Sequence, residues 1–315
     1  MLTPSGAGSV GTSGIRENGG FGMAKKAAPV TVKQALASAA RKLRAAHSDS
    51  PRLDAEILLA EALGCTREQL YGEPERELTA AERERFEAFV ARRKKREPVA
   101  YITGKRRFRT IELRVNENTL IPRPETETLV EVGLEFLAEL GKEQPRVLDI
   151  GTGSGAIALA IATEHPSARV VATEVHPAPL EMARQNAVRL GLQDRVTFVV
   201  SDVYDDLPPG SRFDLILSNP PYVTPQALRR MAIDVRGYEP WVALLGGERG
   251  LDFYERIIPG APVFLEPRGM LAVEIPETKV VEVISLFVEV DRFDGIDVRN
   301  DLSGRPRVVY ARERP

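Results

Sequence analysis

Apolar residues between positions 29 and 97 recur three and four places apart, which is the spacing of one face of an α-helix. Two such faces are formed by Val32, Leu36, Ala39, Leu43 and Ala46, and by Leu53, Ile57, Ala60 and Leu63. Gly64 follows the second face and predicts its end. Thr79, with Glu82 three residues later, predicts a capped third helix. This helix would bury Phe86, Phe89 and Val90. We therefore predict a small helical bundle over residues 29–97.

The pattern changes twice after the bundle. Residues 98–124 combine strand-like alternation with turn residues, and they predict a hairpin linker. From residue 125 to 315, short apolar runs alternate with helical segments, which is typical of an α/β domain. The expected strands are 147–150, 170–173, 196–200, 215–217 and 271–275, and the expected helices are 156–164 and 178–190.

Alternation at this pitch predicts a mostly parallel sheet covered by helices on both faces. The last two apolar runs, 296–299 and 307–311, flank Ser303-Gly304. A glycine-containing turn between two short runs predicts an antiparallel hairpin at the C-terminal end of the sheet. The length of 315 residues is consistent with two domains. Residues 1–28 are rich in Gly and Ser, and we expect them to be a disordered extension.

Charge and cysteine content exclude several classes of protein. The 43 basic and 45 acidic side chains leave a net charge of −2, without the basic excess of a protein that binds nucleic acid through its phosphates. The basic run at residues 92–96 is expected to be a solvated last helical turn. The single cysteine, Cys65, permits no internal disulfide, and the three histidines lack metal-ligand spacing. Because no apolar run approaches the roughly 18 residues of a membrane span, we expect a soluble, cytoplasmic protein without a metal site.

A glycine-rich turn follows the first strand of the α/β region. Asp149 lies just before the turn, which consists of Gly151, Thr152, Gly153, Ser154 and Gly155. Glycines let the backbone turn sharply and approach a ligand, and the helix beyond offers free N–H groups. Glu174 ends the next strand, about 20 residues on, where an acid binds ribose hydroxyls in nucleotide-binding folds. The turn and the acid predict a nucleotide-like cofactor.

These residues alone do not distinguish between several possible cofactors. Gly151, Gly153 and Ala156 would equally suit a nicotinamide dinucleotide, and a plain turn without any ligand is also compatible. Asp149 favours another ligand, because its carboxylate would repel a pyrophosphate. A carboxylate there suits the cationic end of a ligand that carries a sulfonium and an ammonium group.

The most informative segment is Asn219-Pro220-Pro221-Tyr222, which follows an apolar strand. The carboxyl ends of such strands form the edge at which open α/β sheets bind ligands. Two prolines fix two φ angles and remove two donors, so the carbonyl oxygens there remain rigid acceptors. A nitrogen with two hydrogens could donate one to the Asn219 side chain and the other to the Pro220 carbonyl. Its lone pair would then face an activated methyl group, and the Tyr222 ring would lie against the planar target.

Several motifs in order resemble the PrmC or HemK family of protein-(glutamine-N5) methyltransferases, from about Val32 to the C-terminus. They are Asp54-Ala55-Glu56-Ile57-Leu58-Leu59, Pro98 to Gly104, Leu120 to Glu127, Tyr238-Glu239-Pro240, Gly246-Gly247 and Gly250-Leu251-Asp252, together with Asn219 to Tyr222. Two positions depart from the family pattern. Glu174 stands for the commoner Asp, and Pro276 stands where the family usually has Gly.

The resemblance implies a Rossmann-like class I methyltransferase with a seven-stranded sheet, an N-terminal domain that recognises the substrate, and S-adenosyl-L-methionine as cofactor. It implies that the substrate is the glutamine of the Gly-Gly-Gln motif of class I peptide chain release factors, so that methylation supports translation termination. Gly151 to Gly155 and Glu174 would then bind the cofactor, Asp202 and Val203 would close over its adenine, and Asn219 to Tyr222 would hold the glutamine. A binding role for Ile121 to Glu125 is also possible, beside that of a proline-rich helix start.

Three alternatives are open at this point. An adenine-N6 methyltransferase would share the Asn-Pro-Pro-Tyr loop, but it would need a basic recognition face, whereas residues 29–97 carry both signs of charge. A nicotinamide-dependent oxidoreductase would share the glycine turn. A non-catalytic module would bind release factor without turnover.

Overall fold

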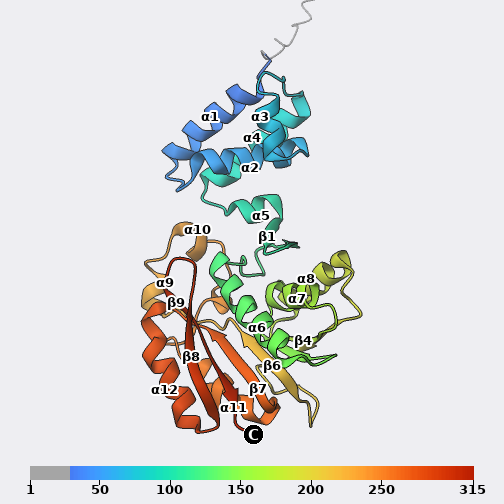
Figure 1. The fold of residues 1–315 in the computed structure, drawn as a ribbon. Helices are drawn as coiled ribbons and strands as arrows, with labels where there is room; N and C mark the ends of the chain where they lie inside the picture. Colours follow the sequence, from blue (N-terminus) through green and yellow to red (C-terminus); the bar gives the residue numbers. More distant parts are fainter. Residues whose placement is uncertain (1–28) are drawn as a thin grey trace, which may run out of the picture.

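The computed structural model describes residues 29–315, so the expectation for residues 1–28 lies outside the described part. The N-terminal region is a helical bundle, at the top of Figure 1. Its helices are α1 (Val32–Ala45), α2 (Pro51–Leu63), α3 (Arg67–Gly72) and α4 (Ala80–Lys94). The predicted end at Gly64 and the capping box of Thr79 and Glu82 are confirmed, since Gly64 is left-handed and Glu82 N–H donates to Thr79 Oγ1.

Two expectations for the bundle are wrong in part. The apolar face predicted for α2 includes Leu53, which is 40% exposed, whereas Ala55, Leu58 and Leu59 are fully buried. Helix α2 contacts α1, α3, α4 and α5, so most of its circumference is covered and spacing alone could not identify its inner face. The basic run at residues 92–96 is not simply a solvated turn, because Arg93 is only 5% exposed.

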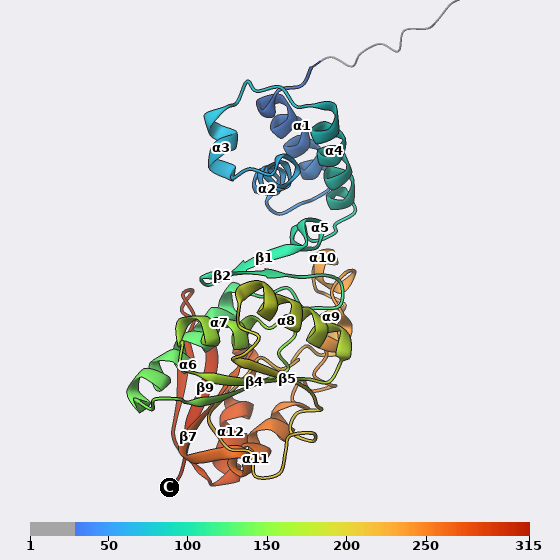
Figure 2. The ribbon, with the colours of Figure 1, turned by 90° about the vertical axis from the view of Figure 1, so that its right-hand side faces the viewer.

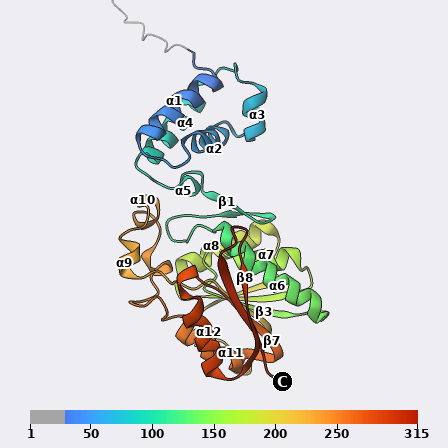
Figure 3. The same ribbon diagram turned by 60° about the vertical axis from the view of Figure 1, so that its left-hand side comes forward.

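Arg93 is buried because it pairs with acids from two regions of the chain. Its Nε donates to Asp54 Oδ2 at 2.7 Å and its Nη1 donates to Asp234 Oδ2 at 2.6 Å. Arg96 also pairs with Asp234, at 2.5 Å, and the Tyr238 hydroxyl donates to the Lys95 carbonyl at 2.7 Å. These contacts join α4 to α10 (Ile233–Arg236), and Figures 2 and 3 both place α10 close beneath the bundle.

A short linker separates the bundle from the α/β region. It contains α5 (Val99–Thr103) and the antiparallel strands β1 (Lys105–Phe108) and β2 (Ile111–Arg114), which confirm the predicted hairpin. Figure 2 shows the hairpin lying across the side of the α/β region that carries α7 and α8. Asn186 of α8 fixes it there: its Oδ1 accepts from Arg114 N–H at 2.7 Å, and its Nδ2 donates to the Arg114 carbonyl at 3.0 Å.

The α/β region is built on a seven-stranded sheet in the order β5-β4-β3-β6-β7-β9-β8. The strands are β3 (Arg146–Ile150), β4 (Arg169–Glu174), β5 (Val196–Val200), β6 (Phe213–Ser218), β7 (Leu265–Glu274), β8 (Phe293–Asn300) and β9 (Pro306–Glu313). The pairs from β5 to β7 are parallel, whereas β9 is antiparallel to β7 and to β8. The mostly parallel sheet with a C-terminal antiparallel hairpin is therefore confirmed.

Helices cover both faces of this sheet. The helices of the α/β region are α6 (Glu127–Leu140), α7 (Ala156–Glu164), α8 (Pro177–Leu190), α9 (Pro225–Leu228), α10, α11 (Tyr254–Phe264) and α12 (Val280–Val290). Three short 3₁₀ turns accompany them: η1 (Pro124–Thr126), η2 (Trp241–Ala243) and η3 (Glu277–Lys279). One apolar core joins the sheet to α6, α7 and α8, and a second joins the opposite face to α11 and α12 (Figures 1 and 3). Within residues 29–315, no helix has the length and apolar character needed to cross a membrane.

Candidate active site

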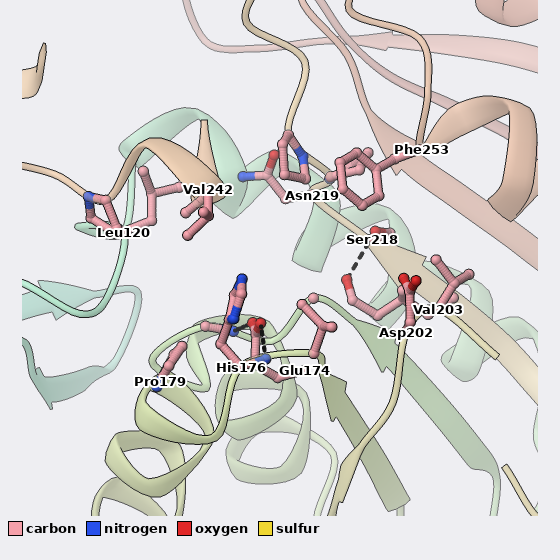
Figure 4. Close-up of a pocket in the computed structure, with 18 of the residues that line it drawn as sticks. Leu120, Glu174, His176, Pro179, Asp202, Val203, Ser218, Asn219, Val242 and Phe253 are labelled. Carbon is pink, nitrogen blue, oxygen red and sulfur yellow. Dashed lines mark hydrogen bonds between the residues drawn. The ribbon is translucent and has the colours of Figure 1, made fainter. Parts of the chain in front are cut away.

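A cavity of about 330 Å³ opens at the carboxyl ends of β3, β4 and β6. This is the edge of a parallel sheet where loops converge, and the volume is in the range of small-molecule sites. Figure 4 shows Glu174 and His176 on one side of the cavity and Asn219 on the other. The predicted cofactor loop and the predicted catalytic loop therefore border one space.

The glycine turn forms part of the cavity wall with its backbone. Gly151 and Gly153 have φ values of 73° and 56°, in the left-handed region that glycine adopts without strain. The N–H groups of Gly151 and Thr152 both donate to the Thr173 carbonyl at 2.9 Å, which fixes the turn against β4. Gly155 has a packing role, because a Cβ there would lie 2.8 Å from Leu159 Cδ1.

Asp149 lies beneath this turn and is completely buried. Its Oδ2 accepts from Thr152 Oγ1 at 2.6 Å and from Ala158 N–H at 3.1 Å, whereas its Oδ1 has no hydrogen-bond partner in the described part of the chain. Burial raises the pKa of Asp149 to about 7, and the two hydrogen bonds oppose the rise. A buried carboxylate oxygen without a donor is unfavourable, so this position is suited to a cationic ligand group close by.

Glu174 supports the glycine turn from the neighbouring strand. Its Oε2 accepts from Gly153 N–H at 3.2 Å and its Oε1 accepts from His176 N–H at 3.1 Å. Burial raises the pKa of this carboxyl group, and the two backbone N–H groups oppose that rise. Each carboxylate oxygen can accept a further hydrogen bond, so Glu174 can bind a pair of ribose hydroxyls.

The wall beyond Glu174 is formed by Asp202, Val203 and two apolar side chains, Phe253 and Ile257. Asp202 pairs with Arg256 at 2.9 Å. Val203 has a φ of 59°, which is unfavourable for a β-branched residue and is typical of backbone that is constrained at a functional site. A carboxylate next to an apolar wall can accommodate a planar base that carries an amino group.

The catalytic loop has one side chain that its surroundings orient. Asn219 Nδ2 donates to Thr126 Oγ1 at 3.1 Å, and Thr126 is 4% exposed. In residues 29–315, no hydrogen bond reaches Asn219 Oδ1 or the Pro220 carbonyl. Both oxygens are therefore available as acceptors for a ligand in the cavity.

A second loop, at residues 244–250, supports the catalytic loop from outside the cavity. The Val223 N–H donates to the Leu244 carbonyl at 2.8 Å, and Gly246 N–H donates to the Val223 carbonyl at 3.0 Å. A Cβ on Gly246 would lie 2.4 Å from the Pro221 carbonyl oxygen, and one on Gly250 would lie 2.4 Å from that of Tyr222. Only glycine permits this approach of the two backbones.

The structure brings most of the predicted site residues together on the cavity wall. Those on the wall are Gly151, Gly153, Glu174, Asp202, Val203, Asn219, Pro220 and Pro221. The others, which do not line it, are Asp149, Thr152, Ser154, Gly155 and Tyr222. The Tyr222 side chain packs against the core that contains α11 and α12, so this placement gives no support to the expected stacking of its ring on the target.

Part of the wall, and all of its support, could not be identified from individual residues of the sequence. The missed wall residues include Asn118, Leu120, His176, Pro179, Val242 and Phe253, and the missed support includes Thr126. These residues come from the linker, from α8 and from the segment after the catalytic loop, and only the tertiary fold brings them together. Glu239 connects two of these regions, since it accepts from Ile121 N–H at 3.1 Å and from Arg123 Nη2 at 2.6 Å.

The chain matches two family models. Residues 127–234 match the model described as methyltransferase small domain, and residues 34–104 match the model described as PrmC N-terminal domain. The sheet order, the glycine turn with its strand-end acid and the cavity at the carboxyl edge agree with the first match. The protein is a methyltransferase.

Its relatives give the family. The chain is 42% identical over 284 residues to the release factor glutamine methyltransferase of Koribacter versatilis, covering 90% of this chain and 99% of the relative. It is 41% identical over 286 residues to that of Moorella thermoacetica, covering 90% of this chain and 100% of the relative. The chain belongs to the release factor glutamine methyltransferase family. Membership sets aside the oxidoreductase and the non-catalytic module.

A solved structure supports the fold alone. The hMettl16 catalytic domain, in complex with MAT2A 3′UTR hairpin 6, superposes with a TM-score of 0.51 at 18% identity, covering 63% of this chain and 74% of that chain. The class I methyltransferase fold is therefore confirmed in its sheet and covering helices.

Proposed function

We propose that this enzyme transfers a methyl group from S-adenosyl-L-methionine to the side-chain amide nitrogen, N5, of the glutamine in the Gly-Gly-Gln motif of class I peptide chain release factors. One observation carries the proposal: the glycine turn with Glu174 and the Asn219-Pro220 acceptors border the same cavity. A cofactor bound along the first wall would present its methyl group toward the second. The names of the relatives supply the release factor and its glutamine.

The proposed cofactor contacts are made by residues of the cavity wall and by Asp149 beneath it. Gly151 and Gly153 offer unobstructed backbone, since a Cβ on either would meet no atom within 4 Å. Glu174 would accept hydrogen bonds from the ribose hydroxyls, and Asp202 would accept one from the amino group of the adenine beside Phe253. Asp149 would contribute from beneath, with its unpaired Oδ1 favouring the positive charge of the cofactor. Thr152, Ser154 and Gly155 would act by shaping the turn.

An amide nitrogen is a weak nucleophile because its lone pair is delocalised, so the reaction requires assistance from the residues of the site. The cofactor, when bound, supplies a methyl group activated by a positively charged sulfur. Asn219 Oδ1 and the Pro220 carbonyl would each accept one N–H of the glutamine amide, which fixes the nitrogen and stabilises the positive charge that develops on it. Pro220 and Pro221 hold these acceptors rigid. Once alkylated, the nitrogen is acidic enough to lose a proton to water.

The N-terminal bundle, residues 29–97, would recognise the body of the release factor, and residues 98–124 would hold it against the catalytic domain, residues 125–315. Support comes from the ion pairs of Arg93 and Arg96 with Asp234, and from the bonds of Glu239 with the linker. Both acids belong to the segment that leads to Val242 and Ala243 on the cavity wall. The position of the bundle is thereby coupled to the mouth of the cavity.

The test is transfer of labelled methyl to purified release factor, compared with a release factor whose tip glutamine is changed to alanine. We expect label on the first protein and none on the second. Equal labelling of both would refute the glutamine as target. Label on a nucleic acid containing unpaired adenine, with none on release factor, would identify an adenine-N6 methyltransferase instead.

A further inference from the structure

A buried carboxyl group lies beside the catalytic loop but outside the cavity wall. Glu274, the last residue of β7, is 1% exposed, and its Oε2 has no hydrogen-bond partner in the part of the chain that is described. Strand β7 is parallel to β6, with Val273 opposite Ser218. Asn219 follows Ser218 and Glu274 follows Val273, so the register places Glu274 beside the residue that holds the target.

No ion pair within residues 29–315 compensates this burial. The charge of Arg307, on β9, lowers the pKa of Glu274, but its guanidinium is paired with Asp301 at 3.2 Å and donates to the Ile275 carbonyl at 3.4 Å. Burying a carboxylate without a cation is unfavourable, and an uncharged residue of the same shape would usually be tolerated there. An acidic residue at such a position indicates a function.

The groups that face Glu274 come from four elements. The Thr126 and Tyr222 hydroxyls lower the pKa of its carboxyl group, as does the positive charge of Arg307, whereas Glu125 raises it. Burial is the largest effect, and it raises the pKa of Glu274 to about 7. Tyr254 contacts only the backbone here, donating to the Glu274 carbonyl at 2.7 Å.

The direction in which the Thr126 hydroxyl donates its proton matters for Asn219, because Thr126 Oγ1 accepts from Asn219 Nδ2 at 3.1 Å and its proton is left for another acceptor. A hydroxyl group has one proton to donate. When Thr126 donates it to the Glu274 carboxylate, its oxygen can only accept, so the side-chain amide of Asn219 must present Nδ2 to Thr126 and Oδ1 to the cavity. When Glu274 is protonated, Thr126 is free to donate to Asn219 Oδ1. The amide then presents its N–H groups toward the N–H groups of the substrate.

We propose that Glu274 is a positioning residue for the methyl transfer: its carboxylate sets the proton of Thr126, and Thr126 sets the orientation of the Asn219 acceptor. Glu274 does not touch the substrate or the cofactor. The inference rests on the proposed function, because it assigns the Asn219 oxygen to the target nitrogen. Protonation of Glu274 turns the Asn219 oxygen away from the cavity, so activity rises with pH as Glu274 ionises.

The first test is the pH dependence of kcat/KM for release factor at saturating S-adenosyl-L-methionine, so that Asp149, whose pKa is also raised to about 7, does not titrate in an empty cofactor site. The wild type should gain activity up to a plateau above a midpoint near pH 7. Glu274→Gln should lose on the order of 10-fold to 100-fold at pH 8 and lack this dependence, with its affinity for S-adenosylhomocysteine unchanged. Thr126→Val should behave in the same way. Glu277→Gln, an exposed carboxylate three residues away, is the matched control and should follow the wild type.

A second readout does not depend on turnover. In the free enzyme, the side-chain NH₂ signal of Asn219 in ¹⁵N NMR should shift with a midpoint near pH 7, and this shift should be absent in Glu274→Gln. Retention of the wild-type pH profile or of the NMR transition in Glu274→Gln would overturn the inference. An equal loss of S-adenosylhomocysteine affinity would also overturn it, by showing general damage to the site. A wild type that shows the NMR transition but does not methylate release factor would defeat the proposed function alone.

Discussion

The contact between the catalytic loop and the loop at residues 244–250 provides a sharp test, because one methyl group disturbs it. In Gly246→Ala, the new Cβ would lie 2.4 Å from the Pro221 carbonyl oxygen and 2.8 Å from Tyr222 Cα. Ordinary contact begins at 3.4 Å, so one backbone must move by about 1 Å, which is the difference between 3.4 and 2.4 Å. Neither neighbour is a flexible side-chain end that could yield.

A displacement of this size at the reacting centre lowers turnover on the order of 100-fold, because the acceptors no longer align the nucleophile. Affinity for S-adenosylhomocysteine should change little, since the glycine turn and Glu174 lie on the opposite wall. The assay is single-turnover methylation of release factor, with calorimetry of S-adenosylhomocysteine binding. Gly72→Ala, in α3, is the control, because its Cβ would meet no atom within 4 Å. Turnover within twofold of wild type in Gly246→Ala would refute the claim that the position of this loop limits the reaction.

Three further predictions follow from the same contacts. Asn219→Ala should lower kcat on the order of 100-fold to 1000-fold with cofactor affinity retained, in steady-state and binding assays, and a wild-type kcat would contradict the assigned role. Asp234→Asn leaves Arg93 and Arg96 without this charge partner. The KM for release factor should therefore rise about tenfold at nearly constant kcat, which corresponds to about 1.4 kcal/mol. An unchanged KM would show that the position of the bundle does not affect recognition of release factor. Glu274 has a folded-state pKa of about 7 against an ordinary 4.5, so the folded chain retains a proton that the unfolded chain releases over this interval. The contribution of this proton to stability is complete below pH 4.5 and is lost as the pH rises to 7. In urea titrations, the free energy of unfolding of wild type relative to Glu274→Gln should therefore fall by about 3 kcal/mol across that window. A constant difference would show that the pKa of Glu274 is unshifted.

Much of the fold could be predicted because its signals are local. The helix from Ala156 to Glu164 and the strand from Val196 to Val200 have the predicted bounds, and the C-terminal hairpin forms around the predicted turn. Hydrophobic period and capping residues act within a few positions, so the sequence contains them directly. The glycine turn and the Asn-Pro-Pro-Tyr loop could be placed at one edge because parallel strands share a carboxyl end.

Features that depend on distant partners could not be predicted. The burial of Arg93 requires Asp234, 141 positions away, and without that partner a cation at a helix end is expected to be solvated. Helix α11 contains Pro259 and Pro262, which disfavour a helix locally, yet the helix buries Tyr254 and Ile257 against the sheet.

The support of the site has the same limitation. Thr126 precedes α6 and Glu274 ends β7, and neither belongs to a pattern that predicts contact with the other. Their position beneath Asn219 follows from the parallel register of β6 and β7 and from the packing of α6 against the sheet. Residues that hold a catalytic side chain in place are recognised by their contacts, and these exist only in the folded chain.

The central claim is that two oxygen acceptors orient the glutamine nitrogen toward the methyl donor. A crystal structure with S-adenosylhomocysteine and a peptide containing Gly-Gly-Gln measures this directly. We expect Asn219 Oδ1 and the Pro220 carbonyl oxygen each to lie about 3 Å from the glutamine nitrogen, which faces the sulfur. An Asn219 side chain turned into the protein interior, with the glutamine nitrogen bound elsewhere, would contradict it.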